Sequence, residues 1–248
     1  LRDLHIVNQA AVCLINGGRK EEAVAMLKQE CDNNENADPT AQCLLGDLMN
    51  DEQYYSQAWT GSKSTFFPAL RALGLSQYRR EDFAAAQSTF AKLTVANPSM
   101  VDNWYLLGCC QLQQQLWTEA IDSFTRVIAA DHDHSQAWNN MAAVHLHLNN
   151  LEAAQHALKM SARLEFDAWR IWDNLFRVSL RLGDLFECVL ACQRLLELRG
   201  AEGGFAPFLA LMNRLSETPD LHTDDARWQS LFKSIDCLVG WMDKLFGD

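Results

Sequence analysis

Apolar residues recur along this chain at helical spacing, and the same arrangement returns every 34 residues. Three tryptophans mark the repeat, namely Trp104, Trp138 and Trp172. A large apolar residue follows each of them three positions later, as Leu107, Met141 and Leu175. A small residue follows sixteen positions later, as Ala120, Ala154 and Cys188. Apolar positions three and four apart predict amphipathic helices, so the pattern predicts one helical hairpin written repeatedly.

A period of 34 residues is the tetratricopeptide period, in which each unit is a helix, a turn and a second helix. One such pair cannot bury its apolar face alone, so successive pairs stack into a superhelix with a concave side. We therefore predict an all-α fold, a tetratricopeptide-type right-handed α-solenoid of about six helical hairpins plus C-terminal capping helices. The predicted units lie near residues 4–37, 39–66, 67–100, 101–134, 135–168 and 169–202, and the helical cap at 203–248.

Two units depart from the regular pattern. Only 28 residues separate Pro39 from the next repeat start at Phe67, so we expect either a shortened second helix or a tighter turn in that unit. In the sixth unit the bulky Phe176 replaces the Gly or Ala of the earlier units, and we expect that helix pair to be more widely spaced.

The period ends after Arg199, where Gly200, Gly203 and Gly204 predict a break before a short apolar helix at 205–217. A strongly amphipathic helix is predicted beyond Thr223. Its apolar stripe consists of Trp228, Leu231, Phe232, Ile235, Leu238, Val239, Met242 and Phe246. Two interpretations stay open for this helix: a cap that covers the last repeat, or a docking helix for a partner.

Composition narrows the function classes. A net charge of −11 and a pI near 5.0 argue against a general nucleic-acid binder, which needs a basic surface. The eight cysteines form no CxxC pair and suit a reducing compartment, and neither a membrane span nor a signal peptide is evident. We expect a cytoplasmic or nuclear protein. Because the chain begins at Leu1 rather than Met, we expect a portion of a longer protein.

The candidate site is the concave face, which the first helix of each hairpin lines in this repeat type. The side chains predicted to face it are mainly polar and locally basic. They are Arg71, Arg79, Tyr105, Gln136, Asn139, Asn140, Arg170, Asp173, Asn174, Arg177 and Arg181. Amides donate and accept hydrogen bonds at once, and guanidinium groups fork onto carboxylates, so we predict an extended or acidic protein segment as the ligand. The alternative is a solvated polar face with ion pairs such as Asp173 with Arg177.

Other chemistry finds little support in the residues. The clamp for the acidic C-termini of heat-shock chaperones needs Lys and Asn where this chain has Tyr105 and Cys109, so direct capture of those termini is not predicted. The His132–His134 and His145–His147 pairs lack the geometry of a metal site, and no enzyme motif is present. We predict no enzymatic activity, no cofactor, no metal, no direct nucleic-acid binding and no membrane association.

Several stretches together resemble one family of these repeat proteins. They read EAVAMLKQE at 22–30, CLLGDL at 43–48, YYSQAW at 54–59, AWNN at 137–140, WRIWDN at 169–174 and LLELR at 195–199. On these stretches the chain resembles the tetratricopeptide repeat protein 27 family over about residues 19–199. The resemblance implies the C-terminal repeat portion of the family, whose long N-terminal half is absent from this sequence.

The resemblance implies a non-enzymatic, chaperone-like assembly factor. Its partners would be proteins of the U5 spliceosomal particle (U5 snRNP), including the particle's translation-factor-like GTPase, and the Hsp90 co-chaperone machinery. Two other functions stay open: a peptide-receptor adaptor that captures acidic tails, and the regulatory part of an enzyme whose catalytic domain lies outside this sequence.

Overall fold

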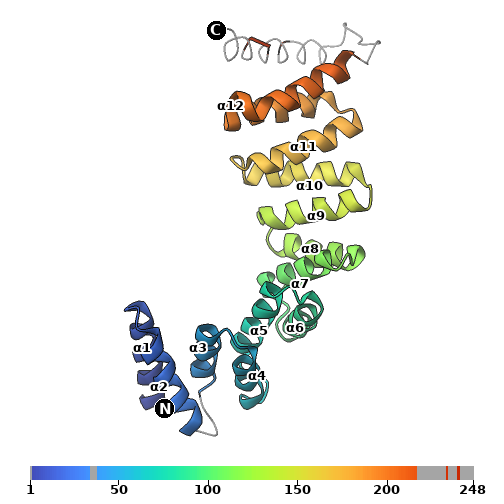
Figure 1. Cartoon of the computed structure of the whole chain (residues 1–248). Coiled ribbons are helices and arrows are strands. Elements are labelled where there is room, and N and C mark those ends of the chain that lie inside the picture. Colours follow the sequence, from blue (N-terminus) through green and yellow to red (C-terminus); the bar gives the residue numbers. More distant parts are fainter. Residues whose placement is uncertain (1, 34–37, 217–232, 234–238, 241–248) are drawn as a thin grey trace. The chain divides into compact units, whose positions relative to one another are not determined.

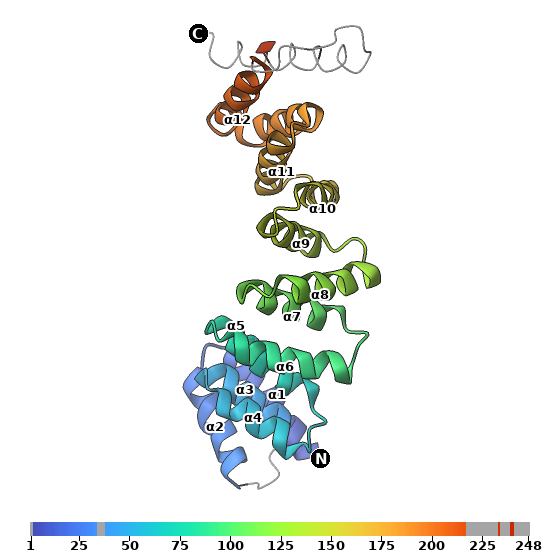
Figure 2. The ribbon, with the colours of Figure 1, turned by 90° about the vertical axis from the view of Figure 1, so that its right-hand side faces the viewer.

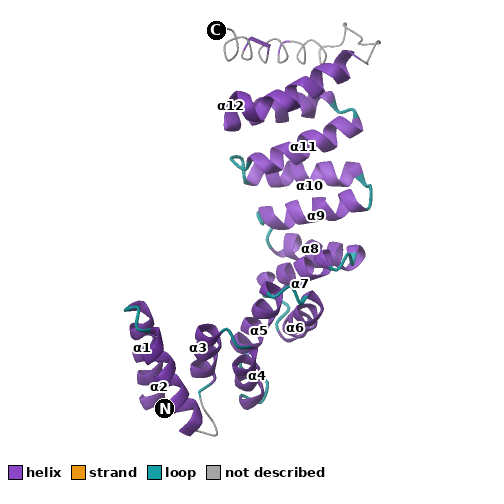
Figure 3. Ribbon diagram, viewed as in Figure 1, coloured by secondary structure: helices purple, strands orange, loops and turns teal. Residues whose placement is uncertain are grey.

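The computed structural model describes residues 2–33, 38–216, 233 and 239–240, and every regular element among them is a helix (Figure 3). The chain divides into two compact units, residues 1–119 and 120–248. The fold is an all-α tetratricopeptide-type solenoid, as predicted. Within the described residues, no helix is both long enough and apolar enough to cross a bilayer.

The first unit is built from consecutive antiparallel helices (Figure 1). They are α1 (Arg2–Asn16), α2 (Lys20–Asn33), α3 (Pro39–Met49), α4 (Glu52–Gly61), α5 (Phe67–Arg79), α6 (Phe83–Ala96) and α7 (Val101–Gln113). Helix α8 (Trp117–Ala130) contains the division between the units. Consecutive helices from α1 through α7 pack against one another.

The second unit continues the series with α9 (Ser135–His147), α10 (Leu151–Leu164), α11 (Trp169–Leu182) and α12 (Leu185–Ser216). These helices pack in chain order, and both views show them stacked one after another (Figures 1 and 2). One apolar cluster runs through this stack from Trp138 to Leu211.

Local signals set the helix ends. Pro39 occupies the first turn of α3, where its missing N–H costs nothing, and the Asp38 carboxylate accepts from the Thr40 N–H. Asp51 and Asp82 cap α4 and α6 in the same way. Helix α1 ends at Asn16, and Gly18 in the turn that follows has a φ of 76°, which glycine adopts without strain.

The second hairpin is shorter than its neighbours. Helices α3 and α4 have 11 and 10 residues, whereas α5 and α6 have 13 and 14. The expected shortening is therefore confirmed. The small-residue position is still kept, since Ala58 is fully buried.

Close approach of the two helices in a hairpin depends on a pair of positions sixteen residues apart. An ideal Cβ on Gly74 would lie 2.9 Å from Cζ of Phe90, so only glycine fits there without a shift. In the second unit Ala142 and Leu158 hold the same positions, and both are buried. The smaller residue at the first position, Gly74, is paired with the larger one at the second, Phe90, whereas Ala142 is paired with the smaller Leu158.

The sixth hairpin reverses this arrangement. Phe176 is at the position of Gly74 and Cys192 is at the position of Phe90, and the two belong to one buried cluster. The small thiol thus compensates for the large ring. The wider spacing of this helix pair, which was expected from Phe176 alone, stays a prediction.

Helix α12 differs from the prediction. A helix was expected at 205–217 after a glycine break, but α12 resumes directly after Gly200 and ends at Ser216. Gly200 alone makes the kink, with φ 63° and ψ −161°, while Gly203 and Gly204 remain helical. One non-helical residue is enough to redirect the helix. Most of the amphipathic segment beyond Thr223 lies outside the described residues.

Candidate protein-binding face

The three repeat tryptophans make the same hydrogen bond. Each indole Nε1 donates a hydrogen bond of 2.9 Å to the carbonyl oxygen six residues earlier, in the turn before its helix. The acceptors are Pro98, His132 and Phe166. Each bond fixes the first helix of a hairpin to the preceding turn, so α7, α9 and α11 present equivalent positions in the same phase.

The candidate residues divide between the two units. In the first unit Arg71 and Arg79 lie on α5 and Tyr105 lies on α7. The remaining eight lie on two first helices of the second unit. Helix α9 carries Gln136, Asn139 and Asn140, and α11 carries Arg170, Asp173, Asn174, Arg177 and Arg181.

In the first unit the arginines have partners within the protein. A terminal guanidinium nitrogen of Arg71 lies 3.0 Å from Oδ2 of Asp102, which is on α7. Arg79 donates from Nε to the Leu75 carbonyl oxygen at 3.3 Å. The sequence analysis did not name Asp102. The repeat pattern could have indicated Asp102, because this residue stands at the second position of the unit that follows the one containing Arg71.

On α11 the charged residues are partly neutralised. Nε of Arg177 lies 2.9 Å from Oδ2 of Asp173, one turn away, so the predicted ion pair is confirmed. The Arg177 side chain is nevertheless 73% exposed. Arg181 donates to Oδ1 of Asn149 at 2.8 Å, which ties the end of α11 to the turn after α9.

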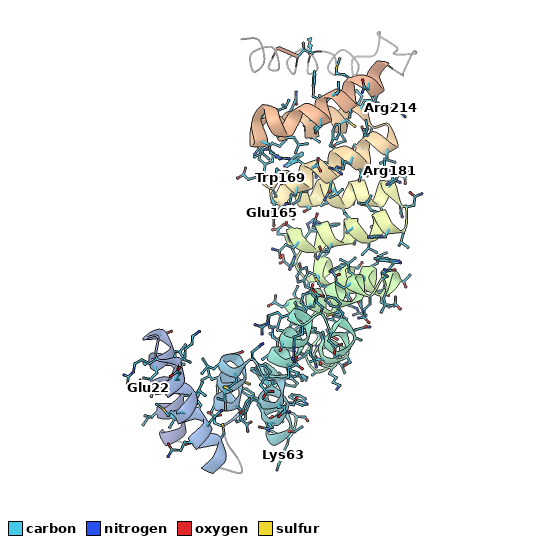
Figure 4. The ribbon with its side chains drawn as sticks, in the orientation of Figure 1. Glu22, Lys63, Glu165, Trp169, Arg181 and Arg214 are labelled. Carbon is cyan, nitrogen blue, oxygen red and sulfur yellow. The ribbon has the colours of Figure 1, made fainter. Side chains whose placement is uncertain are left out.

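Amide groups accompany these arginines. Gln136 and Asn174 are exposed, and Asn139 and Asn140 are half-buried. Asn140 and Asn174 hold the same position in consecutive units. The ends of α11 are chemically different, with Trp169 at one end and Arg181 at the other (Figure 4).

Burial shifts the pKa of several titratable groups in the second unit. Burial raises the pKa of the Cys188 and Cys192 thiols to about 12, so both stay protonated. Burial also lowers the pKa of His145 on α9, which favours its neutral form. Among the described residues, no three His, Cys, Asp or Glu side chains group as metal ligands.

This face can therefore bind by hydrogen bonds and ion pairs. Amides at repeated positions can pair with successive peptide units of an extended chain, and the outer guanidinium nitrogens can receive carboxylates. The chemistry suits reversible recognition of a polar segment.

Comparison with known proteins agrees with the repeat pattern. The family model described as "Tetratricopeptide repeat" matches residues 71–133 and 111–164. A TPR repeat-containing protein of Schizosaccharomyces pombe is 30% identical over 195 residues, which are 78% of this chain and 24% of that protein. The "Tetratricopeptide repeat protein 27 homolog" of Dictyostelium discoideum is 28% identical over 110 residues, or 44% of this chain and 13% of that protein.

The chain thus spans about a quarter or less of the length of these two relatives. Among solved structures, the protein YrrB, titled "a TPR protein with an unusual peptide-binding site", superposes with a TM-score of 0.55 at 17% identity. The superposition covers 72% of this chain and 90% of YrrB. This likeness concerns the fold.

Proposed function

Because the chain carries tetratricopeptide repeats, we propose that it is a non-enzymatic protein-binding scaffold that holds an extended, acidic segment on the first helices of its second unit. The observation that carries the proposal is the exposed Arg177 beside amides at repeated positions. Nε of that guanidinium lies 2.9 Å from Oδ2 of Asp173, and a guanidinium has donors on all three nitrogens. A carboxylate of the ligand can use the terminal pair in forked geometry.

The test uses a short glutamate-rich peptide and a copy in which glutamine replaces glutamate. Binding of the first and much weaker binding of the second is expected, measured by fluorescence anisotropy. The combined change Asn140→Ala, Asn174→Ala and Arg177→Ala should weaken binding by roughly tenfold or more, because charge-assisted hydrogen bonds are lost.

A matched control removes an arginine and an amide from second helices. Arg163 on α10 is exposed and Gln193 on α12 is half-buried, so Arg163→Ala with Gln193→Ala should leave both binding and thermal stability unchanged. Equal binding by the wild type and the triple variant would show that this face does not bind the peptide.

A finer proposal concerns the client. The resemblance to the tetratricopeptide repeat protein 27 family supports a chaperone-like assembly factor that acts on U5 snRNP proteins together with the Hsp90 co-chaperone machinery, in the cytoplasm or nucleus. Affinity purification of the full-length protein with mass spectrometry tests this. Recovery of large particle subunits supports assembly, whereas recovery of short tail-bearing proteins alone favours a peptide-receptor adaptor.

A further inference from the structure

Two arginines in the second unit lie against one tryptophan. The guanidinium carbon of Arg199 on α12 is 4.1 Å from the ring centroid of Trp169, and that of Arg170 on α11 is 5.4 Å from it. The three residues are partly or fully exposed. Stacking against an indole holds a guanidinium group in place by its face and leaves the in-plane N–H donors available.

The neighbouring charges are already paired within the protein. Arg194 contacts Asp167 at 2.8 Å and Glu197 at 2.7 Å, and its guanidinium carbon is 3.6 Å from the Phe166 ring centroid. Asp173 contacts Arg177. Arg170 and Arg199 both lie against Trp169, so they place two positive charges beside one ring.

From this arrangement we infer that Trp169, Arg170 and Arg199 form a binding site for a phosphorylated serine or threonine of a partner protein. A phosphate monoester carries between −1.5 and −2 charges near pH 7, which roughly matches two guanidinium groups.

The remaining charge distribution narrows the class of ligand. A phosphodiester backbone carries one charge per phosphate and requires an extended basic surface, whereas the chain has a net charge of −11. An isolated pair of arginines on an acidic protein suits one dianionic group on a protein segment. The inference rests on the proposed function only in that the ligand is a protein.

The first experiment tests the site without assuming a ligand sequence. N-acetyl-phosphoserine methylamide is titrated into the 248-residue chain, and the arginine Nε–H and indole N–H signals are followed by NMR. Saturable shifts at Arg170, Arg199 and Trp169 are expected. The variant Arg170→Ala with Arg199→Ala should weaken binding by roughly tenfold or more, and Arg163→Ala should bind as the wild type does.

A second variant separates stacking from charge. Replacing both arginines with lysine keeps two positive charges but removes the planar fork, so affinity should fall to an intermediate value. Thermal melting checks that each variant is folded. Absence of saturable binding, or equal binding by the wild type and the double alanine variant, would overturn the inference.

The source of the phosphate is decided by competition. A random phosphoserine peptide library and its dephosphorylated copy are passed over the immobilised chain, and the phosphorylated library should be retained selectively. If inorganic phosphate binds as tightly as the best peptide in this competition, the ligand is the free phosphate ion instead. Stronger retention of a single-stranded oligonucleotide would indicate nucleic acid, and either result contradicts a phosphoprotein ligand.

The two proposals fail in different ways. If the glutamate-rich peptide binds through Asn140, Asn174 and Arg177 but phosphorylation adds nothing, the scaffold function stands and this inference is wrong. If phosphoserine binds at Trp169 while the glutamate-rich peptide does not bind, the inference survives without the acidic-segment proposal.

Discussion

At the scale of single residues, the repeat tryptophans join two roles. Trp172 is 5% exposed, and its Nε1 donates to the Phe166 carbonyl oxygen. Trp104 makes the same bond to Pro98 but is more exposed. The indole ring fills the core while its polar edge closes a turn, which phenylalanine cannot do.

Trp172→Phe is expected to lower the free energy of unfolding by about 1–3 kcal/mol, because it removes one of the two hydrogen bonds that the Phe166 carbonyl accepts and also removes buried ring volume. Urea denaturation followed by circular dichroism measures the change. Trp104→Phe is the matched control and should cost less, since water reaches its acceptor more easily. A Trp172→Phe chain as stable as the wild type would show that the bond is unimportant.

At the scale of the helix pair, complementary volumes decide how closely two helices pack. Gly74→Ala places a methyl group 2.9 Å from Phe90 and should cost about 1–3 kcal/mol through overpacking. Adding Phe90→Leu recreates the natural combination of Ala142 with Leu158 and should cost less than the sum of the two single changes. A double-mutant cycle in urea measures this coupling, and strict additivity would contradict it.

In helix α12 the backbone conformation of one residue, Gly200, decides the direction of the helix. Gly200 combines a φ of 63° with a ψ of −161°, and no atom lies within 4 Å of an added Cβ. Gly200→Ala should therefore cost about 1–3 kcal/mol from backbone strain alone.

Gly183 provides the comparison for that change. It has a φ of 75° and a ψ of 17°, the left-handed helical region, which alanine enters at about 1 kcal/mol. Thermal denaturation of both variants shows which substitution lowers the stability more. A larger loss for Gly183→Ala than for Gly200→Ala would mean that the kink is not under strain.

At the scale of the whole molecule, the helices from α1 to α7 and from α9 to α12 form two series in which each helix packs mainly on its neighbours in the chain. In such an array a destabilising substitution acts locally, because the total stability is a sum of the intrinsic stabilities of the repeats and the energies of the interfaces between neighbours. Gly74→Ala should therefore raise amide hydrogen exchange in α5, α6 and adjoining helices and leave α10 and α11 nearly unchanged. Hydrogen exchange with mass spectrometry measures this, and uniform acceleration along the chain would indicate one cooperative block.

The sequence determined the fold because the relevant signals are local and periodic. The 34-residue spacing located the equivalent tryptophans, Pro39 and Gly18 marked helix ends, and the short second unit was visible from its length. Each of these depends on propensity or helix phase within one hairpin. The phase also placed the polar residues of the first helices at equivalent positions.

Only the tertiary structure decided which charged groups have partners. Arg71 meets Asp102 from the next hairpin, and Arg199 reaches Trp169 from another helix, whereas the ion pair of Arg177 with Asp173 was predictable from one helical turn. The phase of a repeat fixes the face of the helix from which a side chain projects. Which group its far end meets depends on how neighbouring helices cross and on the kink at Gly200, which no local pattern contains.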